Sequence, residues 1–443
     1  MRRHLIRGAL LLALASAVTT PARPALAQDE DSKGMPAPGE GRDEQEPVTW
    51  AEFEPGKGFH IAKTKLGELW ISGYALARYL NQLPGSQSYE THLGVPTSVL
   101  TRNDIHIHRM LLFFRGWAFV PRFEYNLTMW TVNSADILAF IGTLAYKFHR
   151  AFNLAVGIDG LPGIRSLLGS HPYWLGSDRT MAEEFTRPGF TNAIWVTGEV
   201  LPGLFYKFSA GNNISQLDIT AAQLTRDFAF GGSIWWMPTT KEFGPRGAFG
   251  DYEWHEHLAT RFGVSSVRAR EDHYTPLDQP PGSTQIRLAD GVPLFQTGAL
   301  APGVTMSQAT YWNLAADAGL KYHGFFLQGE YHARWLYDFL ANGPVPVHKI
   351  LDHSFYVQAS AMAIRNWWEL YAGTSFVFGD RSAGFRTSWE VIGGTNVYPA
   401  KNRNWRLNGH FIYVDRSVAG GTFGYYSAGL KGPIVSVGVS VFF

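Results

Sequence analysis

Apolar and polar side chains alternate with a period of two residues along much of this chain. The pattern is clearest at the C-terminal end, where the apolar positions are Val435, Val437, Val439, Val441 and Phe443. Successive side chains of a β-strand point to opposite faces of its sheet, so each such strand has one apolar and one polar face. Strands of this kind suit a barrel with a lipid-facing exterior and a wet interior. The barrel must be closed, because lipid cannot pair the backbone groups of a sheet edge.

The composition agrees with a membrane barrel. Charged residues make up only 17% of the chain, aromatic residues make up 14%, and glycines number 47. The charged fraction is below the value of about 25% that is usual for soluble domains. No stretch of about 20 residues is apolar enough for a membrane-spanning helix. We therefore predict an all-β, transmembrane antiparallel β-barrel; the alternative is a secreted β-sandwich or propeller.

The N-terminal segment is typical of a secretory signal peptide. A basic start is followed by the apolar run Leu5–Val18 and by the small-residue site Ala25-Leu26-Ala27, so we predict a signal peptide over 1–27. Residues 28–57 are acidic and interrupted by Pro and Gly, which predicts a disordered periplasmic lead-in. The barrel then occupies 58–443. The chain has no cysteine, and we expect it in the outer membrane of a Gram-negative cell.

The alternation predicts about sixteen strands, an even number that places both chain ends on the periplasmic side. The expected ranges are 68–81, 104–119, 121–133, 136–148, 152–158, 192–200, 203–211, 226–238, 252–270, 310–323, 324–339, 352–364, 367–379, 384–398, 402–416 and 424–443. The long connections suit the extracellular side; they are 82–103, 159–191, 212–225 and 271–309. The connection 239–251 is the exception, because it is long for a periplasmic turn.

Several stretches together resemble the phosphate-selective porin O and P family. They are Gly67–Tyr74, Asp104–Tyr125, the region from Glu242 to Gly263, and Lys401–Arg416 with the terminal Phe443. The resemblance implies a sixteen-stranded, trimeric outer-membrane porin with its third loop folded into the pore. It leaves open two solute classes, small polar or anionic solutes in general and phosphate or pyrophosphate in particular. A last strand that ends on Phe443 is also typical of barrels that the outer-membrane assembly machinery recognises.

Charged residues on the polar face of each strand are candidates for lining the pore. The bases are Arg78, Arg109, Arg115, Arg122, Lys147, Lys207, Arg261, Lys321, Arg334, Arg386 and Arg406. The acids are fewer: Glu124, Asp227, Asp317, Glu330, Glu369 and Glu390. A narrow bore with excess positive charge attracts anions, which predicts a passive channel with weak anion preference. The alternative is that these charges pair across strands and brace the wall.

The segment 159–191 is the expected constriction loop, because it is long and rich in Gly and Pro. The same segment contains the bases Arg165, Arg179 and Arg187 and the acids Asp178, Glu183 and Glu184. Folded into the bore, these charges would act on solutes at the narrowest point. The alternative is a surface loop outside the pore.

Catalysis has little support in the sequence. His106 and His108, and likewise His255 and His257, could each present two imidazoles on one strand face, but the spacing supplies no third metal ligand. No nucleophile motif such as G-x-S-x-G occurs, so we predict no catalytic residue, metal or cofactor, and no nucleic-acid partner. An outer-membrane hydrolase, or a structural barrel plugged by its loops, remains an alternative. Tryptophans near strand ends, among them Trp312 and Trp335, are expected in the interfacial belts.

Overall fold

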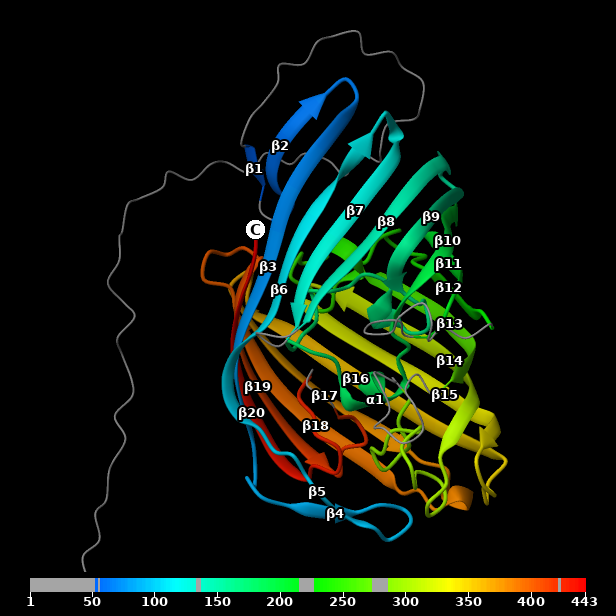
Figure 1. The fold of residues 1–443 in the computed structure, drawn as a ribbon. Coiled ribbons are helices and arrows are strands. Elements are labelled where there is room, and N and C mark those ends of the chain that lie inside the picture. The colour runs from blue at the N-terminus through cyan, green and yellow to red at the C-terminus, as the bar shows by residue number, and fades with distance from the viewer. Residues whose placement is uncertain (1–51, 55, 133–136, 215–226, 273–285, 421–423) are drawn as a thin grey trace, which may run out of the picture. The chain divides into compact units, whose positions relative to one another are not determined.

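Sixteen antiparallel strands form a closed barrel, which confirms the predicted fold class (Figure 1). The computed structural model describes residues 52–54, 56–132, 137–214, 227–272, 286–420 and 424–443. The barrel strands are β3 (Gly67–Gln82), β6 (Asn103–Ala118), β7 (Val120–Val132), β8 (Ile137–His149), β9 (Phe152–Gly160), β10 (Phe190–Leu201), β11 (Leu204–Gly211), β12 (Ala229–Trp236), β13 (Ala259–Asp272), β14 (Met306–Tyr322), β15 (Phe325–Ala341), β16 (Lys349–Ile364), β17 (Trp368–Phe378), β18 (Thr387–Val397), β19 (Trp405–Asp415) and β20 (Gly432–Phe442).

The last strand closes the barrel on the first. β20 pairs with β3 over Ile434–Phe442, and Phe443 exchanges backbone hydrogen bonds of 2.7 and 2.8 Å with Gly73. A Cβ atom at Gly73 would lie 2.5 Å from the ring of Phe443, so the glycine makes room for the terminal aromatic side chain. The terminal alternation therefore forms the seam of the barrel.

The outer faces of the strands are apolar, as lipid contact requires. Leu127 of β7, Val264 of β13, Val391 of β18 and Val437 of β20 all point outward and are exposed. The alternate positions point inward, where polar side chains are frequent. Helical segments are short: η1 (Arg165–Leu167), α1 (Met181–Thr186), η3 (Pro245–Gly247) and η4 (Arg381–Ala383). Among the described residues, no helix combines the length and apolar character needed to cross a membrane.

Ordered structure begins earlier than predicted. β1 (Glu52–Glu54) pairs with β2 (Gly58–Thr64), and β2 pairs with the first half of β3, so the expectation that the lead-in extends to residue 57 is wrong at its end. The hairpin pairs with β3 ahead of Tyr74, where β20 has ended and would leave that edge open. The predicted signal peptide and the rest of the lead-in lie outside the described residues.

Two predicted strands begin too early in the sequence. The range 252–270 contains β13, which starts only at Ala259, because Trp254 has a left-handed backbone (φ 62°) and the carboxylate of Asp251 accepts from the N–H of Gly324 at 2.7 Å. The range 424–443 contains β20, which starts at Gly432. Inside the connection 82–103, β4 (Ser88–Glu90) and β5 (Pro96–Ser98) form a separate hairpin.

Candidate functional site

The connection between β9 and β10 folds into the barrel, as predicted. Within this connection, referred to below as the inner loop (residues 161–189), Leu161, Ile164, Met181 and Phe185 are almost completely buried. α1 begins with a capping box, in which Thr180 and Glu183 bond to each other's backbone N–H groups. The N–H of Met181 donates to Glu390 of β18 at 2.8 Å, and α1 also contacts β16 and β17. The helix therefore lies against the side of the barrel opposite β9 and β10, the strands that the inner loop connects.

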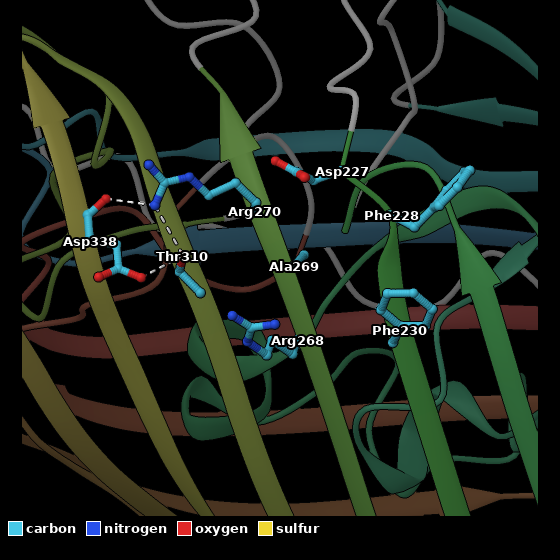
Figure 2. Close-up of a pocket in the computed structure, with 8 residues that line it drawn as sticks. All are labelled: Asp227, Phe228, Phe230, Arg268, Ala269, Arg270, Thr310 and Asp338. Atoms are coloured by element: carbon cyan, nitrogen blue, oxygen red, sulfur yellow. Dashed lines mark hydrogen bonds between the residues drawn. The ribbon is translucent and has the colours of Figure 1, made fainter.

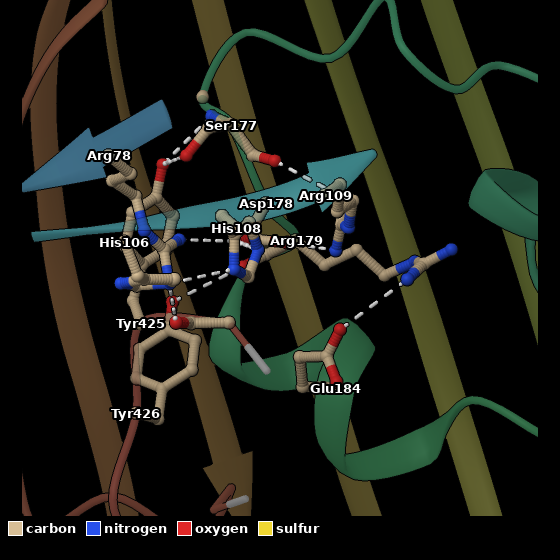
Figure 3. A network of polar contacts seen from close by, with 12 residues as sticks. Arg78, His106, His108, Arg109, Ser177, Asp178, Arg179, Glu184, Tyr425 and Tyr426 are labelled. Carbon is tan, nitrogen blue, oxygen red and sulfur yellow. Dashed lines mark hydrogen bonds and ion pairs between the residues drawn. The ribbon is translucent and has the colours of Figure 1, made fainter. Parts of the chain in front are cut away.

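A buried carboxylate fixes the inner loop to the start of the barrel. Asp178 accepts from the guanidinium groups of Arg78 and Arg109, and Nε2 of His108 lies 2.9 Å from the same carboxylate (Figure 3). Burial alone would raise the pKa of Asp178, but Arg109, His108 and Arg78 hold that pKa well below its usual range. The carboxylate is therefore ionised and binds three partners on β3 and β6. The two arginines are committed to this contact.

Inward bases of later strands also bind the inner loop. Arg334 donates to the carbonyl oxygen of Phe185 at 3.0 Å and to Asp352 at 2.6 Å, and Arg406 donates to the carbonyl oxygen of Trp174 at 2.5 Å. Other inward charges pair with each other, as Arg261 does with Asp317 at 3.0 Å. These pairs fit the bracing alternative for this part of the wall.

The long turn 237–258 also enters the barrel and meets the inner loop. The N–H of Phe249 donates to the carbonyl oxygen of Tyr173 at 2.8 Å, and Arg246 donates to the carbonyl oxygen of Gly169 at 2.8 Å. Arg165 of the inner loop donates to the carbonyl oxygen of Gly247 at 2.9 Å. In the sequence this turn stood out only by its unusual length. The sequence did not predict that the turn enters the barrel.

The two segments leave the barrel interior in two different states. On the wall formed by β13–β20, here called the covered wall, inward charges such as Arg334, Glu330 and Glu390 are at most 2% exposed. On the wall formed by β7–β11, here called the open wall, the side chains of Glu124, Lys147 and Asp159 remain 37–42% exposed, although Lys207 is only 14% exposed and Trp195 of β10 is buried. The open wall carries Arg122, Glu124, Asn126, Lys147, Asp159 and Lys207 on its inner face.

The open wall carries its charges mostly as pairs. Lys147 lies 2.5 Å from Glu124, and Lys207 lies 2.6 Å from Asp159. Arg122 shares the inward parity of Glu124 on β7 and is exposed. Water-accessible charge inside the barrel is therefore concentrated on this wall.

The predicted constriction bases all lie in or next to the inner loop, but they are not aimed into open space. Arg165 is buried between the rings of Phe243 and Phe249, and Arg179 donates to the hydroxyl of Ser166 at 2.8 Å. Arg187 pairs with Glu184 at 2.9 Å. Their influence on permeating solutes remains a prediction.

The remaining predicted residues lie at the ends of strands. Arg115 donates to the hydroxyl of Ser72 at 2.9 Å and to the carbonyl oxygen of Gly56 at 3.0 Å. Arg386 precedes β18 and is exposed. Asp227 precedes β12 and lines a pocket together with the outward-facing Phe228 and Arg268, rather than the inner wall.

The histidine pairs differ in their outcome. His106 and His108 both point into the barrel. Nε2 of His106 lies 3.2 Å from Nδ1 of His108, and His108 contacts Asp178. His255 and His257 do not share a strand face, because they precede β13. His255 instead bridges Asp251 and Glu242; burial opposes its charged form, but these two acids raise the pKa of His255 to about 9.

One group of side chains in this turn has the composition of a metal site. Ligand atoms of Asp251, Glu253 and His255 lie within 4.8 Å of one another. Glu253, however, pairs with Arg403 at 2.5 Å, and Asp251 pairs with the protonated His255. Each ligand is thus already matched by a positive partner, and the cluster is better described as an ion-pair network.

The comparisons with known proteins bear on the fold. No model of a known protein family matches the chain, and no curated protein matches it. Among solved structures, the outer-membrane protein OmpT of Vibrio cholerae is similar, with a TM-score of 0.52 and 12% identity, over 86% of this chain and 99% of that one. A trimer form of the same protein, folded in vitro, gives a TM-score of 0.52 and 10% identity over 86% and 100% of the two chains. At this identity the likeness shows a shared fold, and the resemblance to the phosphate-selective porins is not confirmed.

Proposed function

We propose that this chain is an outer-membrane porin, a passive diffusion channel for small polar or anionic solutes. The observation that carries the proposal is the exposed, charged open wall inside a closed barrel with an apolar exterior. Polar solutes diffuse through the water inside such a barrel, without a covalent step or a cofactor. The path runs off-centre, between the open wall and the inner loop, because the covered wall is occupied.

A weak anion preference is the selectivity that the open wall supports. Glu199 of β10 also points inward, but Arg150 in the β8–β9 turn pairs with it at 2.7 Å. Among the remaining charges, Arg122, Lys147 and Lys207 exceed Glu124 and Asp159 by one, and charges in a narrow bore act strongly on passing ions. The bases of the covered wall contribute less, since they are tied to carboxylates and loop carbonyl groups. A phosphate or pyrophosphate channel would need several exposed arginines in series, so we place it second.

Assembly as a homotrimer is part of the proposal. The outward face of β3 carries Leu69, Ile71, Gly73, Ala75 and Ala77, and small side chains let two barrel walls approach closely. A solved structure of the similar Vibrio cholerae protein is described as its trimer form. We also propose that Phe443 presents the last strand to the barrel-assembly machinery in the outer-membrane lipid.

Single-channel recording in a planar bilayer tests the proposal. We expect stepwise conductance that rises with salt concentration, and a reversal potential in a salt gradient that indicates modest anion preference. A pure, folded barrel that gives no conductance would contradict the porin and favour a plugged barrel or an enzyme. Cation preference at 0.1 M salt would contradict the assignment of the open wall while leaving the channel itself in place.

A further inference from the structure

A pocket of about 460 Å³ lies on the outer side of the barrel, at the end that carries the long loops. Arg268 and Arg270 project into it from β13, next to Phe228 and Phe230 (Figure 2). Both arginines have the outward parity of the exposed Phe262 and Val264 on the same strand. Two bases on the outward face of a barrel strand require an explanation, because a charge on this face is costly in the middle of the bilayer and is tolerated only near its interfaces.

The register of four strands places these bases in an ordered band. Arg270 is paired with Thr310 of β14, Thr310 with Tyr337 of β15, and Tyr337 with Lys349 of β16. This row therefore has a base at each end and two hydroxyl groups between them. The ladder between β14 and β15 is irregular at this level: β15 has an extra residue between Tyr337 and Leu340, where Asp338 has a left-handed backbone (φ 53°).

The next row toward the middle of the barrel is aromatic. Arg268 is paired with Trp312, and Trp312 with Trp335; the two indole rings stack at 4.4 Å between centroids. Outward tryptophans mark the boundary between hydrocarbon and headgroups. The row with Arg270 and Lys349 lies one step beyond this boundary, at the depth of lipid headgroups.

The arginines keep hydrogen-bonding capacity for a ligand. Arg268 donates through Nε to the hydroxyl of Tyr337 at 3.2 Å, and Arg270 donates to the hydroxyl of Thr310 and the backbone oxygen of Asp338. These partners are neutral oxygens. The carboxylates of Asp227 and Asp338 also line the pocket, and Asp272 lies one row beyond Arg270 on the same strand face. The three bases of the band, Lys349 included, are thus balanced by three acids, so the proposal rests on the geometry of the two guanidinium groups and not on an excess of charge.

We propose that this band binds a phosphate group of an anionic lipid in the leaflet on the loop side. Guanidinium groups form forked, charge-assisted hydrogen bonds with phosphate. The exposed rings of Phe228, Phe230 and Trp312 then contact the acyl chains of the same lipid. The inference rests on the membrane location of the barrel in the proposed function, but it does not require that the barrel conducts.

Native mass spectrometry of the detergent-solubilised full barrel tests this binding. The probes are a diphosphorylated glucosamine lipid and the same lipid after removal of its phosphates. We expect the wild-type protein to retain the phosphorylated lipid preferentially. Arg268→Gln with Arg270→Gln should weaken that binding about thirtyfold, since each base near a membrane surface contributes about 1 kcal/mol. Arg268→Lys with Arg270→Lys should give an intermediate loss, because charge is kept and the fork is lost.

A matched control removes two exposed bases from the same end of the barrel, Arg381→Gln with Lys431→Gln. Its lipid binding should equal that of the wild type. Equal binding of the two lipids by the wild type, or full binding by the double Gln variant at positions 268 and 270, would overturn the proposal. Conductance recorded on the same preparations separates this result from a failure of the channel function.

Discussion

The covered wall and the open wall belong to one barrel and share one alternation, yet their inward charges have opposite environments. On the covered wall, Arg334 is fully buried and bonds to a loop carbonyl group and to Asp352. On the open wall, Lys147 and Glu124 form a similar ion pair, but both side chains remain more than one-third exposed. The difference shows that inward parity alone does not make a residue pore-lining. What folds over the wall decides whether its charges stay exposed inside the barrel.

The largest effect is expected at Asp178, which holds the inner loop to Arg78 and Arg109. In Asp178→Asn the carboxylate charge is lost and two buried guanidinium groups remain without their partner. Breaking a buried ion pair in this way costs about 3–5 kcal/mol. We expect the part of the inner loop around Asp178 to leave β3 and β6, while Arg334 and Glu390 still hold α1, and single-channel conductance to rise severalfold.

Asp159→Asn is the matched control for that comparison. This residue pairs with Lys207 on the open wall, where water already screens the pair. Its conductance should stay close to that of the wild type. If Asp178→Asn leaves conductance unchanged in a folded barrel, the inner loop is not held by this carboxylate or does not limit the path.

The strand framework could be predicted from the sequence, because the alternation between lipid and water is a local property of each strand. Val435–Phe443 needs no knowledge of distant contacts to be identified as a last strand. The covered wall could not be predicted in the same way. Asp178 meets Arg78, which lies 100 positions earlier in the chain, and this contact depends on the path of a loop without periodic structure.

The turn 237–258 shows a second limit of the sequence. Its length was visible, but Phe249 meets Tyr173 only because the inner loop also enters the barrel. The alternation around Tyr252–Leu258 resembled a strand, and the hydrogen bonds of Asp251 prevent one. Local pattern thus identified the walls, while non-local contacts decided which wall stays exposed inside the barrel.

Ion selectivity should respond to the open wall next. Arg122→Glu turns the excess of one base on the open wall, with the Arg150–Glu199 pair set aside, into an excess of one acid, so the reversal potential in a salt gradient should move toward cation preference while conductance persists. Arg406→Gln on the covered wall should leave selectivity nearly unchanged and weaken the loop contact with Trp174 instead. Equal shifts from the two variants would show that both walls contact the permeating ions.

The anion preference of the wild type should itself be small and should depend on salt. The screening length falls from about 10 Å at 0.1 M to about 3 Å at 1 M ionic strength. Because the charges of the open wall act across water, the ratio of anion to cation permeability should approach that of free diffusion at 1 M. Reversal potentials measured at both concentrations check this. A preference that persists at 1 M would indicate a specific binding site, as the phosphate alternative requires.

The smallest expected effect is a pH dependence of stability that comes from His255 in the turn 237–258. The pKa of His255 is raised to about 9 by Asp251 and Glu242, above the value of about 6.5 for an unfolded chain. The stabilisation is therefore complete below about pH 6.5 and is lost as pH rises through 9. Partial exposure of the cluster limits the change to about 1 kcal/mol.

The unfolding midpoint in guanidinium chloride should fall between pH 7 and pH 10 in the wild type and much less in His255→Gln. On the open wall, Lys147→Gln should keep the full pH dependence of the wild type, because that pair takes no part in holding the turn. An identical decline in His255→Gln would show that other groups cause the pH dependence.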